Sequence, residues 1–175
     1  VTLEKSTAKT QFKELLNAVK ELKNTKIIFT KANSDTDGRI INSMIDDYVA
    51  KYGNSIAFIS MGHLNYLSAL QYMDVVVGNS SSGLLEVPSF NIATINIGDR
   101  QKGRIMADSV INCLPAKESI NNAFSKAYSK EFKNTIAKSK NPYGSGGASK
   151  EISKIIKGIR LDGIIKKSFY NVNAF

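Results

Sequence analysis

Three consecutive serines stand between two glycines in the stretch DVVVGNSSSGLLEV, residues 74–87. The branched apolar residues before them predict a buried strand, and the apolar residues after Gly83 predict a short helix. A turn at such a place offers backbone N–H groups that have no partner inside the helix, beside short hydroxyl donors. These donors suit a phosphate, although the stretch has neither the Walker lysine pattern nor GxGxxG. One serine is enough to cap a helix, so three between glycines favour an anion site, at which Gly83 would let the backbone approach the anion closely.

A second polar stretch, NIGDRQKGR at residues 96–104, follows the next expected strand. Its Arg100 and Arg104 can each bind a phosphate through two N–H groups, whereas a lysine supplies only a point charge. Glu86, in the first turns after the serines, would repel a phosphate unless it accepted hydrogen bonds from sugar hydroxyls. The alternative for Glu86 is a favourable interaction with the helix N-terminus. A third polar loop, KANSDTDGR at residues 31–39, contains Lys31 and Arg39.

Strand and helix patterns alternate along the chain and position these loops. Strands are expected at 26–30, 55–60, 74–79 and 93–98, with a fifth candidate at 108–113. Helical patterns cover 3–22, 38–53, 64–73, a short segment ending near Pro88, 117–139 and 147–160. Short connections between such elements indicate βαβ units in a doubly wound parallel sheet. Ligands of these sheets lie beyond the carboxyl ends of the strands, where the three polar loops are expected.

The composition fits one globular domain over residues 1–175, with 42% hydrophobic and 22% charged residues. No apolar run approaches the roughly 20 residues that span a bilayer, so we expect no membrane association. The first residues do not resemble a secretory signal, and a start at Val1 suggests that residues upstream are missing. The single Cys113 indicates a core thiol in a reducing compartment, hence a cytoplasmic protein.

The net charge of +9 raises the question of nucleic-acid binding. Most of the basic residues are lysines scattered along the chain, which favours a solvated surface over a nucleic-acid patch. His63 is the only histidine. No Cys or His cluster accompanies it, so we expect it near a helix start and expect neither a metal site nor a cofactor.

The stretches KANSDTDGR, SMGHLNYLSALQYMDVVVGNSSSGLLEVPSFNIATINIGDRQKGR and NPYGSGGASKEI together resemble one family. They are similar to the hydrolysing UDP-N-acetylglucosamine 2-epimerases, in the branch that makes sugars for sialic-type acids. The resemblance covers nearly the whole chain. It implies the C-terminal Rossmann-like domain of a two-domain GT-B fold, with the nucleotide sugar between the domains. The tail, about 159–175, is a candidate for packing on the missing N-terminal domain.

The resemblance also implies a chemistry and a set of contacts. In the family, loss of UDP gives a 2-acetamidoglucal, and addition of water with inversion at C2 gives N-acetylmannosamine. The matching positions put Ser80 and Ser81 on the phosphates, Glu86 on the ribose and Arg100 near the ligand. Arg39 matches a basic position facing the phosphates, and Lys31, Asn33 and Met61 match positions near the uracil.

The family's catalytic carboxylates and histidine belong to the missing half, and His63 does not match that histidine. We therefore expect this chain to bind UDP weakly and to catalyse nothing alone. The full-length protein is expected to take a UDP-sugar as substrate and to form a homo-oligomer. Three alternatives stay open: a related epimerase acting on a UDP-2,4-diacetamido-trideoxy sugar, a GT-B glycosyltransferase, and a non-enzymatic binding module such as a nucleic-acid binder.

Overall fold

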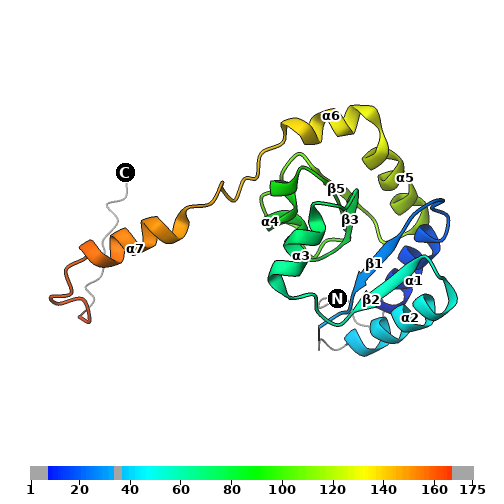
Figure 1. Cartoon of the computed structure of the whole chain (residues 1–175), viewed down its shortest axis with the longest axis horizontal. Coiled ribbons are helices and arrows are strands. Elements are labelled where there is room, and N and C mark those ends of the chain that lie inside the picture. The colour runs from blue at the N-terminus through cyan, green and yellow to red at the C-terminus, as the bar shows by residue number, and fades with distance from the viewer. Residues whose placement is uncertain (1–7, 34–36, 167–175) are drawn as a thin grey trace. The chain divides into compact units, whose positions relative to one another are not determined.

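The computed structural model describes residues 8–33 and 37–166 and divides the chain into two compact units, Val1–Tyr143 and Gly144–Phe175. The first unit carries all the strands and the second carries the helix α7, Ala148–Gly158 (Figure 1). The division falls at Gly144, upstream of the tail from about 159 that the sequence analysis set apart. Each unit is described by itself below.

Parallel strands form the centre of the first unit. One sheet has two strands in the order β1-β2, and the other has three in the order β3-β4-β5. Both sheets are parallel throughout. The strands are β1 Ile27–Thr30, β2 Ser55–Phe58, β3 Val75–Gly78, β4 Ala93–Ile97 and β5 Val110–Cys113. The expected strand positions and parallel direction are confirmed, although hydrogen bonds group the described strands into two sheets.

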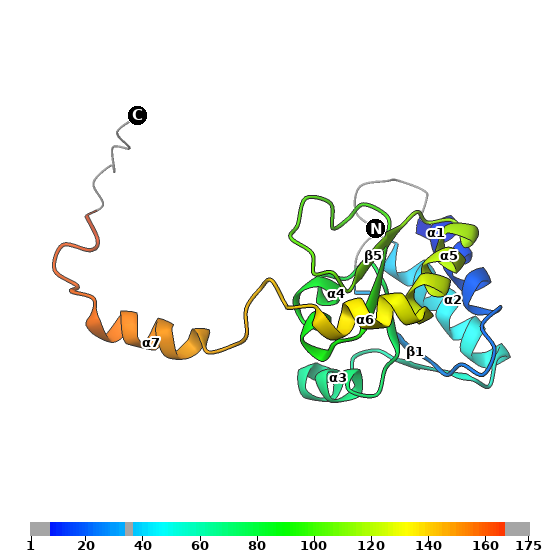
Figure 2. The same cartoon turned by 90° about the horizontal axis from the view of Figure 1, so that it is seen from above.

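Helices lie on both sides of these strands. Figures 1 and 2 show α3 and α4 on one side, away from the group formed by α1, α2 and α5. Contacts join α1 to α5, α5 to β4 and β5, and α2 to β2, while α4 packs on β3 and β4. The helices of this unit are α1 Ala8–Val19, α2 Gly38–Lys51, α3 Gly62–Leu70, α4 Ser82–Leu85, α5 Lys117–Tyr128 and α6 Lys130–Lys138, with a 3₁₀ helix at Val87–Phe90. This alternation around parallel strands is a Rossmann-like arrangement.

The core is centred on β4, whose five residues are all buried. Ile95 is fully buried and belongs to one hydrophobic cluster with residues of α1, α2, α5 and α6. We expected strand 74–79 to be covered on both faces, but the residues of β3 are only half-buried. The physical reason is position: β3 is an edge strand of its sheet, whereas β4 has a hydrogen-bonded neighbour on each side.

Within the described ranges, no helix is both long enough and apolar enough to cross a membrane.

Candidate functional site

The serines after β3 form a tight turn, which we call the serine turn and define as residues 79–83. It follows Gly78, the last residue of β3, whose φ of 148° is one that residues with a side chain rarely adopt. Ser80 is exposed, and Ser81 and Ser82 are half-buried. The turn therefore presents its first two serines to solvent at the carboxyl end of the parallel strands.

The backbone amides of the serine turn divide into used and free groups. The Ser82 amide donates to Ser80 Oγ at 3.3 Å, and the Gly83 amide donates to the Ser80 carbonyl at 3.2 Å. The amides of Ser80 and Ser81 donate to no group within the described part of the chain. Two adjacent N–H groups and two hydroxyls are thus available to bind an anion.

The helix after the serine turn is shorter than the sequence analysis assumed. α4 has only four residues, Ser82–Leu85. A single turn sums few peptide dipoles, so the macrodipole contributes little here. The free amides and hydroxyls of the turn, and not a helix end, are what the structure offers to an anion.

The third serine is engaged inside the protein. Ser82 Oγ lies 2.5 Å from the hydroxyl of Tyr66, which α3 supplies. Burial raises the pKa of Tyr66; the Ser82 hydrogen bond lowers it and the nearby Glu86 charge raises it further. Tyr66 therefore stays a neutral phenol at ordinary pH and ties α3 to the serine turn.

Gly83 serves a different purpose from the one expected. The sequence analysis assigned its missing side chain to an approach between the backbone and a ligand. In the structure a Cβ on Gly83 would lie 2.6 Å from Thr94 Cγ2 of β4. The Gly83 carbonyl also accepts a hydrogen bond of 2.8 Å from Thr94 Oγ1. Gly83 thus permits close packing of α4 on β4.

The loop after β4 reaches back to the serine turn. The Asn79 carbonyl accepts a hydrogen bond of 2.8 Å from Gln101 Nε2 and a longer one of 3.5 Å from Arg100 Nη1. Arg100 is exposed, so its positive charge faces solvent beside Ser80 and Ser81. The structure therefore brings three of the predicted residues together, and adds Gln101, which the sequence analysis missed.

Glu86 lies at the end of α4, on the side of the site that faces α3. Its Oε1 is 3.9 Å from Nδ1 of His63, and about a third of its side chain is exposed. His63 lies in the first turn of α3, as expected, but its side chain is three-quarters exposed. Glu86 therefore keeps a carboxylate accessible near the serine turn.

Of the remaining predicted residues, Lys31 and Asn33 follow β1, Arg39 lies in the first turn of α2, and Met61 directly precedes α3. Lys31 forms an ion pair with Asp46 of α2, with 2.7 Å between Nζ and Oδ1. Asn33 and Arg39 are exposed, and Met61 is half-buried just before α3. No hydrogen bond or ion pair among the described residues joins these four to the serine turn. Asp35, which also belongs to this loop, lies outside the described residues.

Comparison with known proteins identifies the family. The family model described as UDP-N-acetylglucosamine 2-epimerase matches residues 1–157. The chain belongs to this family. It is 38% identical over 98% of its length to a GDP/UDP-N,N'-diacetylbacillosamine 2-epimerase (hydrolyzing) of Campylobacter jejuni. It is 37% identical, again over 98%, to the polysialic acid biosynthesis protein P7 of Escherichia coli. The chain covers 45% and 44% of these two relatives, so it spans less than half of their length.

Solved structures of epimerases share the fold. A UDP-GlcNAc 2-epimerase of Methanocaldococcus jannaschii, in complex with UDP-GlcNAc and UDP, matches with a TM-score of 0.67 at 17% identity, covering 85% of this chain and 41% of that one. The UDP-GlcNAc 2-epimerase of Neisseria meningitidis bound to UDP-GlcNAc matches with a TM-score of 0.64 at 18% identity. This match covers 86% of this chain and 41% of that one. The expected fold class, a Rossmann-like half of a GT-B protein, is confirmed, as is the resemblance to the 2-epimerase family.

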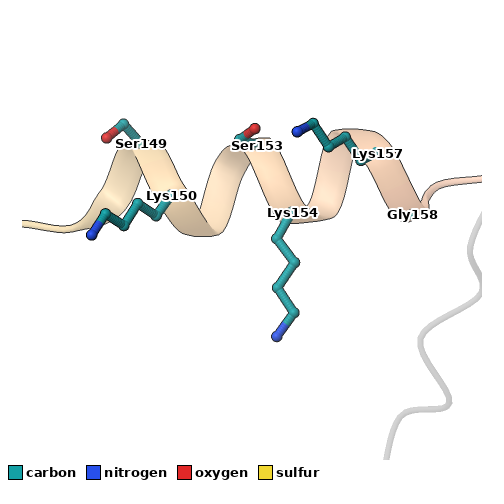
Figure 3. A pocket seen from close by; sticks show the side chains of 6 residues that line it. All are labelled: Ser149, Lys150, Ser153, Lys154, Lys157 and Gly158. Atoms are coloured by element: carbon teal, nitrogen blue, oxygen red, sulfur yellow. The ribbon is translucent and has the colours of Figure 1, made fainter.

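A shallow depression lies along helix α7, and Figure 3 shows the side chains that line it. Its lining comes from one helix, namely Ser149, Lys150, Ser153, Lys154, Lys157 and Gly158. Every residue of α7 is exposed, so the depression has no walls from a second element. We do not assign it as the functional site, because a small-molecule site needs convergent groups that enclose the ligand.

Two further observations bear on metal and thiol chemistry. Residues 8–33 and 37–166 contain no group of three His, Cys, Asp or Glu side chains placed to hold a metal ion.

Burial raises the pKa of the Cys113 thiol to about 11, so the thiol is protonated at neutral pH. Cys113 is half-buried against the core, which is less complete burial than the sequence analysis expected.

Proposed function

We propose that this chain is the UDP-binding, C-terminal half of a hydrolysing UDP-N-acetylglucosamine 2-epimerase. The complete protein would convert UDP-N-acetylglucosamine and water to N-acetylmannosamine and UDP. Support comes from the family match, from relatives of about twice its length, and from the geometry of the serine turn.

The observation that carries this proposal is the pair of free amides at Ser80 and Ser81. Together with their hydroxyls they supply short donors to the oxygens of a diphosphate. The exposed guanidinium of Arg100 adds a positive charge at the same turn and can donate two N–H bonds to one phosphate. The ligand is thus held by directional bonds from the backbone and neutralised by one flexible cation.

Glu86 would accept hydrogen bonds from the ribose hydroxyls. Its carboxylate lies one helical turn beyond the serines, so it avoids direct repulsion by the phosphates. Lys31, Asn33 and Met61 would line the uracil, and Arg39 would face the phosphates. Because Lys31 Nζ is paired with Asp46, its contribution to the uracil site would come from the aliphatic stem.

The reaction assigns a defined task to these groups. The bond between C1 of the sugar and the oxygen of UDP breaks while C2 loses its proton, which leaves the 2-acetamidoglucal and UDP. Water then adds hydroxyl to C1 and a proton to C2 on the opposite face. The serine turn and Arg100 would stabilise the negative charge that grows on the departing diphosphate. The groups that move protons at C2 would belong to the missing domain.

A second substrate is favoured by the names of two relatives. The Campylobacter protein and a 32% identical Legionella pneumophila protein are both called diacetylbacillosamine 2-epimerases. The residues assigned above contact the nucleotide, which the UDP-linked form of that sugar shares with UDP-N-acetylglucosamine. Product analysis of the full-length enzyme with each UDP-sugar would separate the two substrates.

The remaining proposals concern the whole protein. We place it in the cytoplasm, as a homo-oligomer, with a tail from about 159 that packs on the N-terminal domain. Helix α7 supports a packing role for the end of the chain, because it exposes three isoleucines at helical spacing, Ile152, Ile155 and Ile156. Exposed Ile159 follows directly after the helix. The isolated chain would bind UDP without turnover.

Calorimetric titration of the chain with UDP tests the proposal. Ser81→Ala and Arg100→Ala should each weaken binding about tenfold, the usual effect of one hydrogen bond to a charged group. Lys102→Ala, an exposed neighbour in the Arg100 loop, is the control and should bind normally. Equal affinity for UDP in the wild type and all three variants would show that the diphosphate does not bind at the serine turn.

A further inference from the structure

The loop after β4 is hydrogen-bonded to the serine turn at the carbonyl of Asn79. Gln101 Nε2 donates to it at 2.8 Å, and Gln101 is only 3% exposed. The exposed Arg100 adds a contact of 3.5 Å, at the limit of a hydrogen bond. Gln101 therefore holds this carbonyl with a short bond that water does not weaken.

The direction of the Asn79 carbonyl determines the direction of the next amide. The peptide bond is planar, and the described residues contain no cis peptide. In a trans peptide the C=O and N–H bonds point in opposite directions. When Gln101 holds the Asn79 carbonyl on the interior side, the Ser80 N–H must point outward, where Ser80 is exposed.

We infer that Gln101 is a positioning residue of the diphosphate site: it fixes the peptide between Asn79 and Ser80 so that the Ser80 amide faces the ligand. It acts through the backbone and does not touch the ligand itself. The identity of the ligand rests on the function proposed above. The orientation of the peptide does not, because it is a property of the unliganded chain.

The chemistry of the Gln101 side chain separates this role from simple packing. Its Oε1 is buried and has no hydrogen-bond partner among the described residues. An unpaired buried acceptor disfavours the folded state. For packing alone, a methionine would fill similar space without that acceptor, so the distinctive contribution of Gln101 is its N–H donor.

Binding of UDP to a Gln101→Met variant tests the inference. Ile136→Val is the matched control, because it trims a buried core side chain of α6 and removes no hydrogen-bonding group. We expect Gln101→Met to weaken UDP binding about tenfold while its melting temperature stays within a few degrees of the control. Wild-type affinity in Gln101→Met would overturn the inference.

Nuclear magnetic resonance of the unliganded chain gives a second readout that needs no UDP. Order parameters of the Ser80 and Ser81 amides should be near 0.85 in the wild type and in Ile136→Val, as in rigid backbone. In Gln101→Met they should fall below about 0.6. Unchanged order parameters would overturn the inference even if the wild type failed to bind UDP, whereas that failure alone would count only against the proposed function.

Discussion

Tyr66 and Ser82 share a hydrogen bond of 2.5 Å between their hydroxyl groups, which joins α3 to the serine turn. This contact distinguishes the third serine from the first two. The amides of Ser80 and Ser81 have no partner among residues 8–33 and 37–166, whereas the hydroxyl of Ser82 is occupied and its amide is bonded to Ser80 Oγ. In a row of three identical residues, Ser82 is therefore engaged within the protein, and Ser80 and Ser81 are the two that we propose as ligand groups.

Removing the Tyr66 hydroxyl should cost stability and little affinity. Tyr66→Phe should lower the free energy of unfolding by about 1 kcal/mol, the net value of a typical hydrogen bond. Urea denaturation of Tyr66→Phe, Ser82→Ala and the double variant measures this, because partners in one bond give effects that do not add. Fully additive losses would show that the two hydroxyls do not interact in solution.

Glu86 should govern recognition of the ribose. If its carboxylate accepts hydrogen bonds from ribose hydroxyls, wild-type protein should bind UDP about tenfold more tightly than 2′-deoxy-UDP. Glu86→Gln should reduce that ratio, because an uncharged amide is the weaker acceptor. His63→Ala is the control, since His63 lies beside Glu86 but is assigned no contact with UDP. If Glu86→Gln leaves the ratio of the affinities for UDP and 2′-deoxy-UDP unchanged, the ribose does not bind at Glu86.

The packing of Gly83 on β4 predicts a destabilising variant and its rescue. Gly83→Ala places a Cβ 2.6 Å from Thr94 Cγ2, a distance at which one of the two must move. Such overpacking should lower the free energy of unfolding by about 1–3 kcal/mol. Thr94→Ser removes the obstructing methyl and keeps the hydroxyl that bonds the Gly83 carbonyl.

The double variant Gly83→Ala/Thr94→Ser should therefore recover most of the stability lost by Gly83→Ala. Chemical denaturation of the three variants measures this recovery. If the stability lost in the double variant equals the sum of the losses in the two single variants, the methyl group of Thr94 is not the obstacle.

Cys113 should make stability depend on alkaline pH. Burial raises the pKa of its thiol from 9.0 to about 11, so the folded chain holds a proton that the unfolded chain has lost. The contribution of Cys113 to stability is complete below pH 9 and is lost as the pH rises from 9 to about 11. The free energy of unfolding, measured by denaturation at several pH values across this range, should fall more steeply with pH for the wild type than for Cys113→Ala. The same dependence on pH in both proteins would indicate a thiol with an ordinary pKa.

Much of the fold could be predicted because it follows from local patterns. Alternating strand and helix periods located β1 to β5 and most of the helices around them, but the single helix expected at 117–139 is divided into α5 and α6. The two-sheet grouping and the half-burial of β3 depend on which strands become neighbours, and a single strand's composition does not determine that. This is why the most apolar run, 75–77, proved to be an edge strand.

Only part of the candidate site could be predicted from the sequence. The serine run after one expected strand and the arginines after the next indicated Ser80, Ser81 and Arg100 as candidates. Gln101 was missed because its bond to Asn79 joins positions 22 residues apart, and an uncharged amide between two basic residues gives no distinctive signal. The pairing of Tyr66 with Ser82 spans 16 residues and was hidden for the same reason.

The boundary between Tyr143 and Gly144 is a place at which the C-terminal segment could be exchanged with that of a related protein. Before it, Tyr143 donates to the Ile105 carbonyl and Asn141 donates to Leu85 and Ser89, so the first unit secures its own end. After it, no described residue belongs to the hydrophobic core. A codon junction here could receive the C-terminal helix of another family member, and the hybrid should retain the core and serine turn intact.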